Sequence, residues 1–222
     1  MKLWLSWSSG KDSAWTLDHL RREGEHQVVG LLTSYNEEFD RVAVHGVRRS
    51  LLRLQAAAVG LPLIDVALPW PCTNEVYEER MSRAHSRALE EGVDGIAYGD
   101  LFLEDVRAYR ERQLEGSGLT PVFPIWGSET HRLARRMIEA GIESHLTCID
   151  LGRLPRELAG RRFDADLLAD LPDGVDPCGE NGEFHTCVTA GPMFDTSIPF
   201  TFGETVERDG YAFTDMVAGG GR

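Results

Sequence analysis

A short polar segment, SSGKDS at residues 8–13, stands between the first apolar run of the chain and the first helical pattern. Where a strand turns into a helix, small residues and the free N–H groups of the helix N-terminus make a natural anion site. Gly10 would allow a phosphate to approach the backbone closely, and Lys11, one of two lysines in the chain, supplies a positive charge. We therefore expect phosphate binding here. The alternative is a polar turn in which a serine or Asp12 merely caps the helix.

Common nucleotide-binding and hydrolase patterns are missing from this sequence. It contains neither GxxxxGK[ST] nor GxGxxG, so neither a P-loop NTPase nor a dinucleotide-binding protein is indicated. The GxSxG elbow of serine hydrolases is also missing. If residues 8–13 bind phosphate, they do so without any of these patterns.

Candidate residues follow a later apolar run of the chain. Gly99-Asp100 ends this run, which places Asp100 at the carboxyl edge of a predicted sheet, near the phosphate loop. A carboxylate there suits Mg²⁺ on a nucleotide; the alternative is a cap on the next helix. Glu104 and Tyr109 come next in a helical pattern, where a solvated helix face is the alternative to a site.

A glycine-bracketed acidic loop, GENGE at residues 179–183, lies in the last quarter of the chain. Its two glutamates, Glu180 and Glu183, stand three positions apart with Asn181 between them. By itself this pattern is either an acidic surface turn or a binding site for a cation. His185 follows and could act as an acid or base, or hydrogen-bond to the loop.

The elements that must position these residues alternate between strand and helix. Apolar runs predict strands at residues 2–8, 28–34, 63–68, 94–99, 119–125 and 144–150. Helical spacing predicts helices at residues 12–22, 44–58, 75–91, 104–114 and 130–140. This alternation is typical of an α/β fold: a Rossmann-like parallel sheet of about five strands with helices on both faces.

The pattern changes after residue 150. Residues 154–171 predict two short helices around Gly160, and residues 172–183 are dense in turn formers. We therefore expect an α/β domain over residues 1–150 and a small C-terminal subdomain over residues 151–222 that carries the acidic loop.

Composition limits the partners. The 222 residues include 23 basic and 36 acidic side chains, a net charge of −13, which disfavours nucleic acid and anionic membranes. No apolar run approaches the roughly 20 residues that cross a bilayer. The four cysteines form no CxxC pair, so we expect free thiols in the cytoplasm. Cys178, His185 and Cys187 lack the number and spacing of zinc ligands, so a zinc site is not favoured.

Two resemblances rest on these motifs. The loop at residues 8–13 resembles the pyrophosphate-binding loop of the PP-loop ATPases (adenine nucleotide alpha hydrolase-like superfamily), whose pattern is SGGxDS; Ser9 replaces the first glycine. Within that superfamily the chain is similar to the diphthine–ammonia ligase family. This similarity is carried by Gly99-Asp100 followed by LFLEDVRAYRE, by GLTPVFPIW, and by DPCGENGEFH at residues 176–185 followed by Gly191-Pro192.

The family resemblance implies an ATP-dependent amide ligase with a PP-loop (HUP-type) fold. Such enzymes cleave ATP between its α- and β-phosphates and adenylate a carboxylate; ammonia then displaces AMP. In the best-understood members the acceptor is diphthine on translation elongation factor 2. The implied ligands are ATP, Mg²⁺, ammonium and a carboxylate-bearing acceptor such as a modified protein side chain. Neither membrane nor nucleic acid is expected as a partner, and a homodimer is left open.

The resemblance also implies roles for residues. Catalysis would rest on Lys11, Asp12 and Asp100, with Asp100 positioning Mg²⁺. ATP would be bound by Ser8, Ser9, Gly10, Lys11, Asp12, Ser13, Ser34, His45 and Gly99. The acceptor side would comprise Glu104, Tyr109, Trp126, Glu180, Asn181, Glu183 and His185, with the two glutamates facing a cationic group. For His45 the alternative is a histidine at a helix start, and for Trp126 it is a core aromatic.

Two other functions are compatible with the phosphate loop. One is an ATP- or AMP-binding protein of the same superfamily without ligase activity. The other is a tRNA-modifying PP-loop enzyme, which is disfavoured because thiolating versions usually need paired cysteines and a basic docking surface. Release of AMP and pyrophosphate would separate a ligase from a binding protein.

Overall fold

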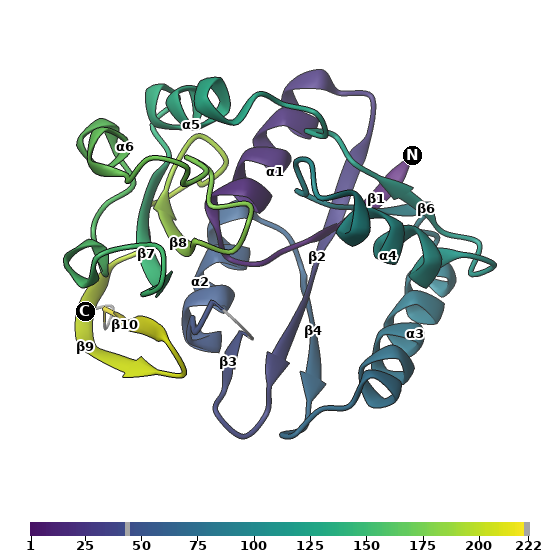
Figure 1. Ribbon diagram of the computed structural model, residues 1–222. Coiled ribbons are helices and arrows are strands. Elements are labelled where there is room, and N and C mark those ends of the chain that lie inside the picture. The colour runs from purple at the N-terminus through teal and green to yellow at the C-terminus, as the bar shows by residue number, and fades with distance from the viewer. Residues whose placement is uncertain (43–44, 220–222) are drawn as a thin grey trace.

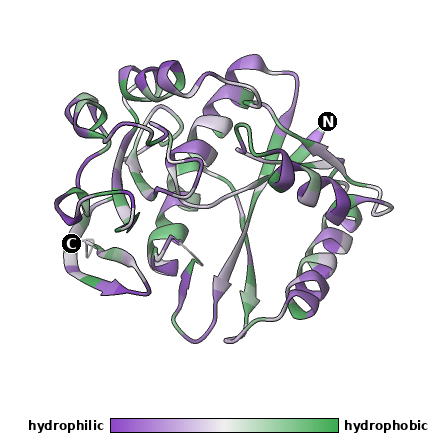
Figure 2. Ribbon diagram, in the orientation of Figure 1, coloured by the Kyte–Doolittle hydropathy of each residue, from purple (hydrophilic) through white to green (hydrophobic). Residues whose placement is uncertain are grey.

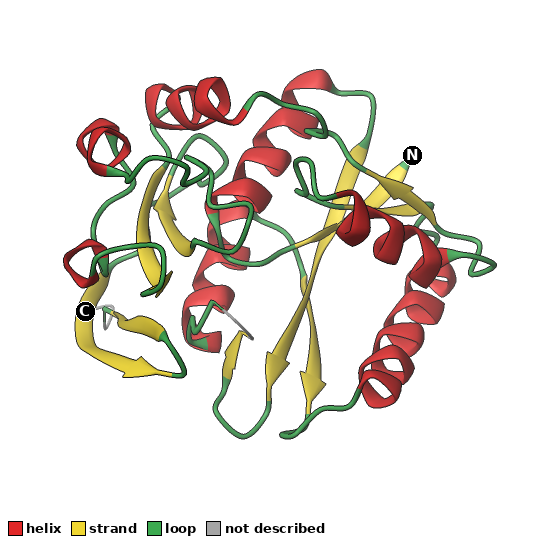
Figure 3. Cartoon of the chain, in the orientation of Figure 1, coloured by secondary structure: helices red, strands yellow, loops and turns green. Residues whose placement is uncertain are grey.

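A parallel sheet forms the centre of the N-terminal part (Figures 1 and 3). The computed structural model of the chain describes residues 1–42 and 45–219. The parallel strands run in the order β4 (Leu63–Leu68), β2 (Gln27–Asn36), β1 (Lys2–Ser6), β5 (Gly95–Ala97) and β6 (Thr120–Val122). The short β3 (Arg41–Val42) pairs antiparallel with the end of β2. The predicted parallel sheet of about five strands is confirmed.

Helices cover both faces of this sheet. They are α1 (Lys11–Glu23), α2 (Arg49–Val59), α3 (Asn74–Glu90), α4 (Glu104–Leu114) and α5 (Thr130–Glu139). Because successive side chains of a strand point to opposite faces, β1 sends Leu3 and Leu5 into a core with α1, α2 and α5, and Trp4 into a second core with α3 and α4. Figure 2 shows the apolar colour on the central strands and polar colour over much of α3 and α5. None of the described helices is long and apolar enough to cross a membrane.

The C-terminal part contains a second, antiparallel sheet. Its strands run in the order β8 (Phe184–Ala190), β7 (Glu143–Asp150), β10 (Tyr211–Ala218) and β9 (Phe200–Arg208). The 3₁₀ helix η1 (Arg156–Leu158) and helix α6 (Ala165–Asp170) connect β7 to the acidic loop. The C-terminal part of the predicted fold thus has a sheet of its own, although sequence reasoning missed β8, β9 and β10. The domain boundary at residue 150 stays a prediction.

The placement of residues 144–150 in the series of parallel strands is wrong. The segment is a strand, but β7 pairs antiparallel with β8 and β10. An apolar strand pattern shows that a strand has buried faces and does not show which strands pair with it. The partners of β7 come only after the turn-rich segment 172–183.

The predicted helix at residues 44–58 begins later than expected. Helix α2 begins at Arg49, and Val42 N donates to Val47 O (2.8 Å), which closes a turn that carries His45. Val44, the predicted first residue of the helix, lies outside the described residues. The buried face also differs, because Leu54 is 37% exposed and Gln55 is fully buried.

Candidate active site

The phosphate loop joins β1 to α1 and has a constrained backbone. Ser9 has a φ of 73°, in the left-handed region that favours glycine, which is the residue of the PP-loop pattern at this position. Its carbonyl oxygen accepts hydrogen bonds from Val188 N (2.9 Å) and Gln55 Nε2 (3.0 Å). A Cβ added to Gly10 would lie 3.2 Å from the carbonyl oxygen of Thr186, so the turn has little room for a side chain. The loop is therefore held from behind, chiefly by its backbone.

The N-terminus of α1 is open to an anion. Gly10 is the N-cap and provides no side-chain cap, while Lys11 N donates to Thr186 Oγ1 (3.1 Å). The N–H groups of Asp12 and Ser13 follow in the first turn and receive no cap from Gly10. Free first-turn N–H groups and the helix dipole favour a phosphate at this position.

A cavity of about 260 Å³ lies where the two sheets meet. Its walls come from the phosphate loop and α1, from the end of β5 and α4, and from the acidic loop and β8. Residues predicted from the sequence make up half of the lining: Ser8, Lys11, Asp12, Ser13, His45, Gly99, Asp100, Glu180 and His185. The structure thus brings the phosphate loop and part of the acidic loop to one place.

Lys11 is buried and engaged. Its side chain is 2% exposed, and Nζ lies 3.0 Å from Asp12 Oδ2 and donates to the carbonyl oxygen of Cys178. The Nζ atom also lies 5.3 and 5.2 Å from the ring centroids of Phe163 and Phe184. Burial lowers the pKa of Lys11, but Asp12 and other negative neighbours outweigh it and hold this pKa above its ordinary value. Lys11 therefore ties the phosphate loop to the acidic loop.

Three carboxylates face the cavity from three different elements. They are Asp12 in α1, Asp100 after β5 and Glu180 in the acidic loop. Asp12 Oδ1 and Asp100 Oδ2 are buried without a hydrogen-bond partner, whereas Glu180 Oε1 accepts from Leu101 N (2.7 Å). Burial raises the pKa of all three groups, that of Glu180 to about 7. Carboxylate oxygens without partners fit a hard cation such as Mg²⁺.

Protein side chains alone do not form a closed metal centre in the part of the chain that the structure describes. No group of three or more His, Cys, Asp or Glu side chains is arranged there to hold an ion. A pair such as Asp12 and Asp100 suits an ion that also takes phosphate oxygens and water as ligands.

Glu183 lies behind the cavity and supports the acidic loop. It is fully buried, and its Oε1 accepts from Asp176 N (3.1 Å), Asn181 Nδ2 (3.1 Å) and Arg153 NH1 (3.4 Å). Asp176 Oδ2 in turn accepts from Cys178 N (3.1 Å) and Glu180 N (2.9 Å). These bonds fix the loop so that Glu180 lines the cavity.

Two histidines sit side by side in the cavity wall. The ring centroids of His45 and His185 are 4.4 Å apart. Burial lowers the pKa of both, that of His185 to about 4, so both are neutral at neutral pH. Asp215 holds the segment that carries His45, because it accepts from Arg41 (2.8 Å) and Arg48 (2.6 Å); these bonds lower its pKa to about 2 even though burial opposes this.

The remaining predicted residues lie outside this cavity. Ser34 lies in β2 and Glu104 begins α4. Tyr109 accepts a hydrogen bond from Gln113 Nε2 (2.9 Å) and lines a separate cavity between α3 and α4. Trp126 packs edge-on against Phe123, with the Arg107 guanidinium 4.9 Å from its ring centroid.

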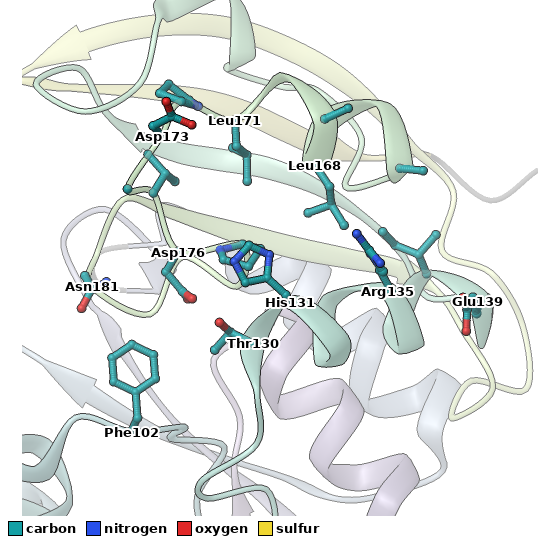
Figure 4. A pocket seen from close by; sticks show the side chains of 17 residues that line it. Phe102, Thr130, His131, Arg135, Glu139, Leu168, Leu171, Asp173, Asp176 and Asn181 are labelled. Atoms are coloured by element: carbon teal, nitrogen blue, oxygen red, sulfur yellow. The ribbon is translucent and has the colours of Figure 1, made fainter.

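A larger cavity of about 960 Å³ opens on the other face of the acidic loop (Figure 4). It lies between α5, α6 and loop residues 171–177. Phe102 and Asn181 are at one end and Glu139 at the other, and Asp176 projects between them. The acidic loop therefore separates two cavities: residues 178–180 line the small one, and Asp176 and Asn181 line the large one.

Sequence reasoning missed one residue that holds the site together. Gln55 Oε1 accepts from Trp7 Nε1 (2.8 Å), and Gln55 Nε2 donates to the carbonyl oxygens of Ser9 and Val188 (2.8 Å for Val188). Its sequence signal is an amide on a helix face that is otherwise apolar. A buried amide of this kind needs hydrogen-bond partners and so indicates a connection through the core.

Comparison with known proteins identifies the family. The model of the diphthamide synthase N-terminal domain matches residues 1–121, and that of the diphthamide synthase C-terminal domain matches residues 129–213. The chain belongs to the diphthamide synthase family. This places the phosphate loop, Asp100 and β1–β5 in its N-terminal domain, and the acidic loop in its C-terminal domain.

Curated relatives in this family are named diphthine–ammonia ligase. The protein of Schizosaccharomyces pombe is 27% identical over 220 residues, which is 90% of this chain but 36% of that protein. The human protein is 26% identical over 94% of this chain and 86% of its own length. The Danio rerio protein is likewise 26% identical, covering 94% of this chain and 90% of its own length.

Solved structures align more loosely. A predicted subunit of tRNA methyltransferase from Methanocaldococcus jannaschii gives a TM-score of 0.44 at 16% identity, covering 89% of this chain and 100% of that chain. The U34-tRNA thiolase NcsA from Methanococcus maripaludis gives a TM-score of 0.38 at 18% identity, over 63% of this chain and 57% of its own.

Proposed function

We propose that this chain is an ATP-dependent amide ligase that adenylates a carboxylate and then amidates it with ammonia. The observation that carries the proposal is the meeting of an uncapped helix N-terminus with three carboxylates in one cavity. Family membership adds the reaction class, since the curated relatives are named diphthine–ammonia ligase.

The phosphate loop would bind the pyrophosphate portion of ATP. The hydroxyl groups of Ser8 and Ser13 lie 3.3 Å apart at the cavity, beside the first turn of α1. Asp12 and Asp100 would hold Mg²⁺ through their unpartnered oxygens. When bound, the ion neutralises charge on the phosphate oxygens and favours departure of pyrophosphate.

The chemistry would proceed in two balanced steps. An oxygen of the acceptor carboxylate attacks the α-phosphorus, the bond from that phosphorus to the bridging oxygen breaks, and pyrophosphate leaves toward the N-terminus of α1. Ammonia then attacks the acyl carbon and AMP leaves with the carbon–oxygen bonding pair. Glu180, whose pKa is about 7, would attract ammonium and accept the proton that nitrogen must lose.

The acceptor is proposed to be a modified protein side chain of the diphthine type. The small cavity holds little beyond phosphates and reacting groups, so the body of the acceptor needs other space. The larger cavity beyond the acidic loop, within the proposed substrate subdomain of residues 151–222 and its border with α5, gives that space. Glu180 and His185 would act at the reacting end, with Glu183 as support for the loop.

A labelling experiment tests the proposal. The chain is incubated with ATP, Mg²⁺, isotope-labelled ammonium and elongation factor 2 that carries diphthine, and the modified peptide is analysed by mass spectrometry. We expect ATP-dependent incorporation of the label, and loss of incorporation in Asp100→Asn. Tight ATP binding without turnover would instead support a nucleotide-binding protein. Modification of tRNA without incorporation of the ammonium label would support the tRNA-modifying alternative.

A further inference from the structure

Arg110 is a cation in the wall of the small cavity for which the proposed reaction has no role so far. It lies on α4, on the same helix face as Leu103 and Val106, and all three line the cavity. Its side chain is 26% exposed, and the guanidinium lies 5.2 Å from the ring centroid of Tyr98. The packing against Tyr98 keeps the guanidinium in a defined orientation at the cavity wall.

The hydrogen-bond donors of Arg110 are only partly used. Its Nε is buried without an acceptor. The nearest opposite charge, Asp100 Oδ2, lies 3.8 Å from Nε, which is too long for a hydrogen bond. Tyr77 and Tyr98 are the other polar neighbours. Burial lowers the pKa of Arg110, but Asp100 and these two tyrosines outweigh it and hold this pKa above its ordinary value. A guanidinium carries five donors in a fork that matches a carboxylate, so this set fits an anionic ligand.

The charge balance of the cavity indicates which anion needs Arg110. Asp12, Asp100 and Glu180 would repel an incoming carboxylate. Lys11 is occupied by Asp12 and by the Cys178 carbonyl oxygen. Among the described residues that line the cavity, Arg110 is therefore the cation with donors to spare.

The position of Arg110 separates it from the phosphates. The pyrophosphate portion of ATP would lie at the N-terminus of α1, next to Ser8 and Ser13. Arg110 reaches the cavity from α4, on the side of Asp100 and Tyr98. Arg110 and the phosphate loop thus belong to different elements of the cavity wall, so an anion at Arg110 would have its own binding group.

We propose that Arg110 binds the carboxylate of the acceptor and orients it toward the α-phosphate. This role rests on the proposed ligase function. It explains how a cavity with three carboxylates can receive a fourth, and it makes Arg110 a catalytic residue because it touches the reacting group.

A protection experiment tests the role without an identified acceptor. The chain is saturated with Mg²⁺ and α,β-methylene-ATP, which cannot be cleaved between its α- and β-phosphates, and is then modified with phenylglyoxal with or without acetate as the carboxylate probe. We expect acetate to slow modification of Arg110 about tenfold while Arg112, an exposed arginine of the same helix, is unaffected. Protection by the nucleotide alone would assign Arg110 to the phosphates. Absence of any protection would leave it as a partner of Asp100. Either result overturns the proposal.

The same experiment distinguishes the two proposals. A thermal shift with α,β-methylene-ATP, measured on the same sample, reports whether the nucleotide binds. Absence of that shift counts against the ligase function, whereas a shift without acetate protection counts against the role of Arg110 alone.

Kinetics of variants give a second, independent test. With diphthine-bearing elongation factor 2 as acceptor, Arg110→Gln should raise the acceptor KM about 30- to 100-fold, because a charge-assisted pair is lost, and change the ATP KM by less than about twofold. The acceptor KM of Arg110→Lys should lie between those of wild type and Arg110→Gln. The matched control Arg112→Gln should have the KM values of wild type. An equal rise in both KM values, or a loss confined to kcat, would contradict the assignment.

Discussion

The phosphate loop and the acidic loop meet over one cavity, yet they use their residues in opposite ways. The phosphate loop is anchored largely through its backbone, at the Ser9 carbonyl oxygen and Lys11 N–H, so that Ser8, Asp12 and Ser13 line the cavity. The acidic loop is anchored by its side chains, because Asp176, Asn181 and Glu183 all bond within the loop.

This difference shows that residue type alone does not identify a functional group. Glu180 and Glu183 look equivalent in the sequence, but one lines the cavity and the other is fully buried with three donors. Glu183 is enclosed by the protein and uses Oε1 to hold the loop, with Oε2 buried and without a partner, so it supports the site. Glu180 lines the cavity and is therefore the glutamate within reach of a ligand.

The largest effect is expected at Asp100, on the cavity edge shared with the phosphate loop. Asp100→Asn removes a charge that the proposed reaction needs but that folding does not, since burial raises the pKa of this carboxyl. Turnover should fall about 100- to 1000-fold, with a melting temperature no lower than that of wild type. Initial-rate assays measure the turnover, and a thermal melt measures the melting temperature. Full activity in the variant would remove Asp100 from the mechanism.

The next effect concerns stability and belongs to the acidic loop. Glu183→Ala leaves Asp176 N, Asn181 Nδ2 and Arg153 without their acceptor. The free energy of unfolding should fall by about 2–3 kcal/mol, a decrease of roughly 5–10 °C in Tm for a chain of this size. Calorimetry checks this, with Glu180→Gln as the matched variant in the same loop. A larger loss of stability in Glu180→Gln would reverse the roles assigned to the two glutamates.

Glu180 should show its raised pKa in the pH dependence of stability. Its folded-state pKa of about 7 lies above the ordinary value of 4.5, so the folded chain binds the extra proton and wild type loses stability as pH rises from about 4.5 to 7. Glu180→Gln should lack this loss, so above pH 7 its free energy of unfolding should exceed that of wild type by about 1–3 kcal/mol. Urea unfolding at several pH values measures the difference; parallel curves for the two proteins would contradict the assignment.

The smallest effect is expected at Asp215, away from both loops. Hydrogen bonds from Arg41 and Arg48 lower the pKa of Asp215 to about 2. Its contribution to the stability of the folded chain is therefore present above pH 3.8 and disappears as pH falls toward 2. Asp215→Asn should lower the free energy of unfolding by only about 1 kcal/mol at neutral pH, because the carboxylate is partly solvated. The exposed Asp209→Asn serves as control. Equal stability of the two variants would show that these ion pairs do not hold the His45 segment.

The sequence predicted the parallel sheet because its strands are apolar runs separated by helices of regular period. The phosphate loop was found for the same reason, since SSGKDS falls between the first run and the first helix. Residues of the second sheet were harder to predict: β9 is largely exposed, and β8 follows directly on a turn-rich loop. Their pairing depends on contacts distant in sequence, which local periodicity does not contain.

Parts of the site were beyond sequence reasoning for a different reason. Nothing in the spacing of GENGE indicates that Glu183 turns inward, because that depends on Arg153 and Asp176 as partners. Engagement of Lys11 by the Cys178 carbonyl oxygen, across 167 positions, is equally a product of the fold. Motifs therefore predicted the candidate site, and burial and hydrogen bonding distinguish the residues that line its cavity from those that support its loops.

The central claim is that this cavity holds ATP for cleavage between its α- and β-phosphates. Phosphorus NMR of a reaction with ATP, Mg²⁺, ammonium and diphthine-bearing elongation factor 2 tests it directly. We expect AMP and pyrophosphate to appear in equal amounts, and neither to appear with Asp100→Asn. Formation of ADP and inorganic phosphate by the wild-type chain would contradict the account.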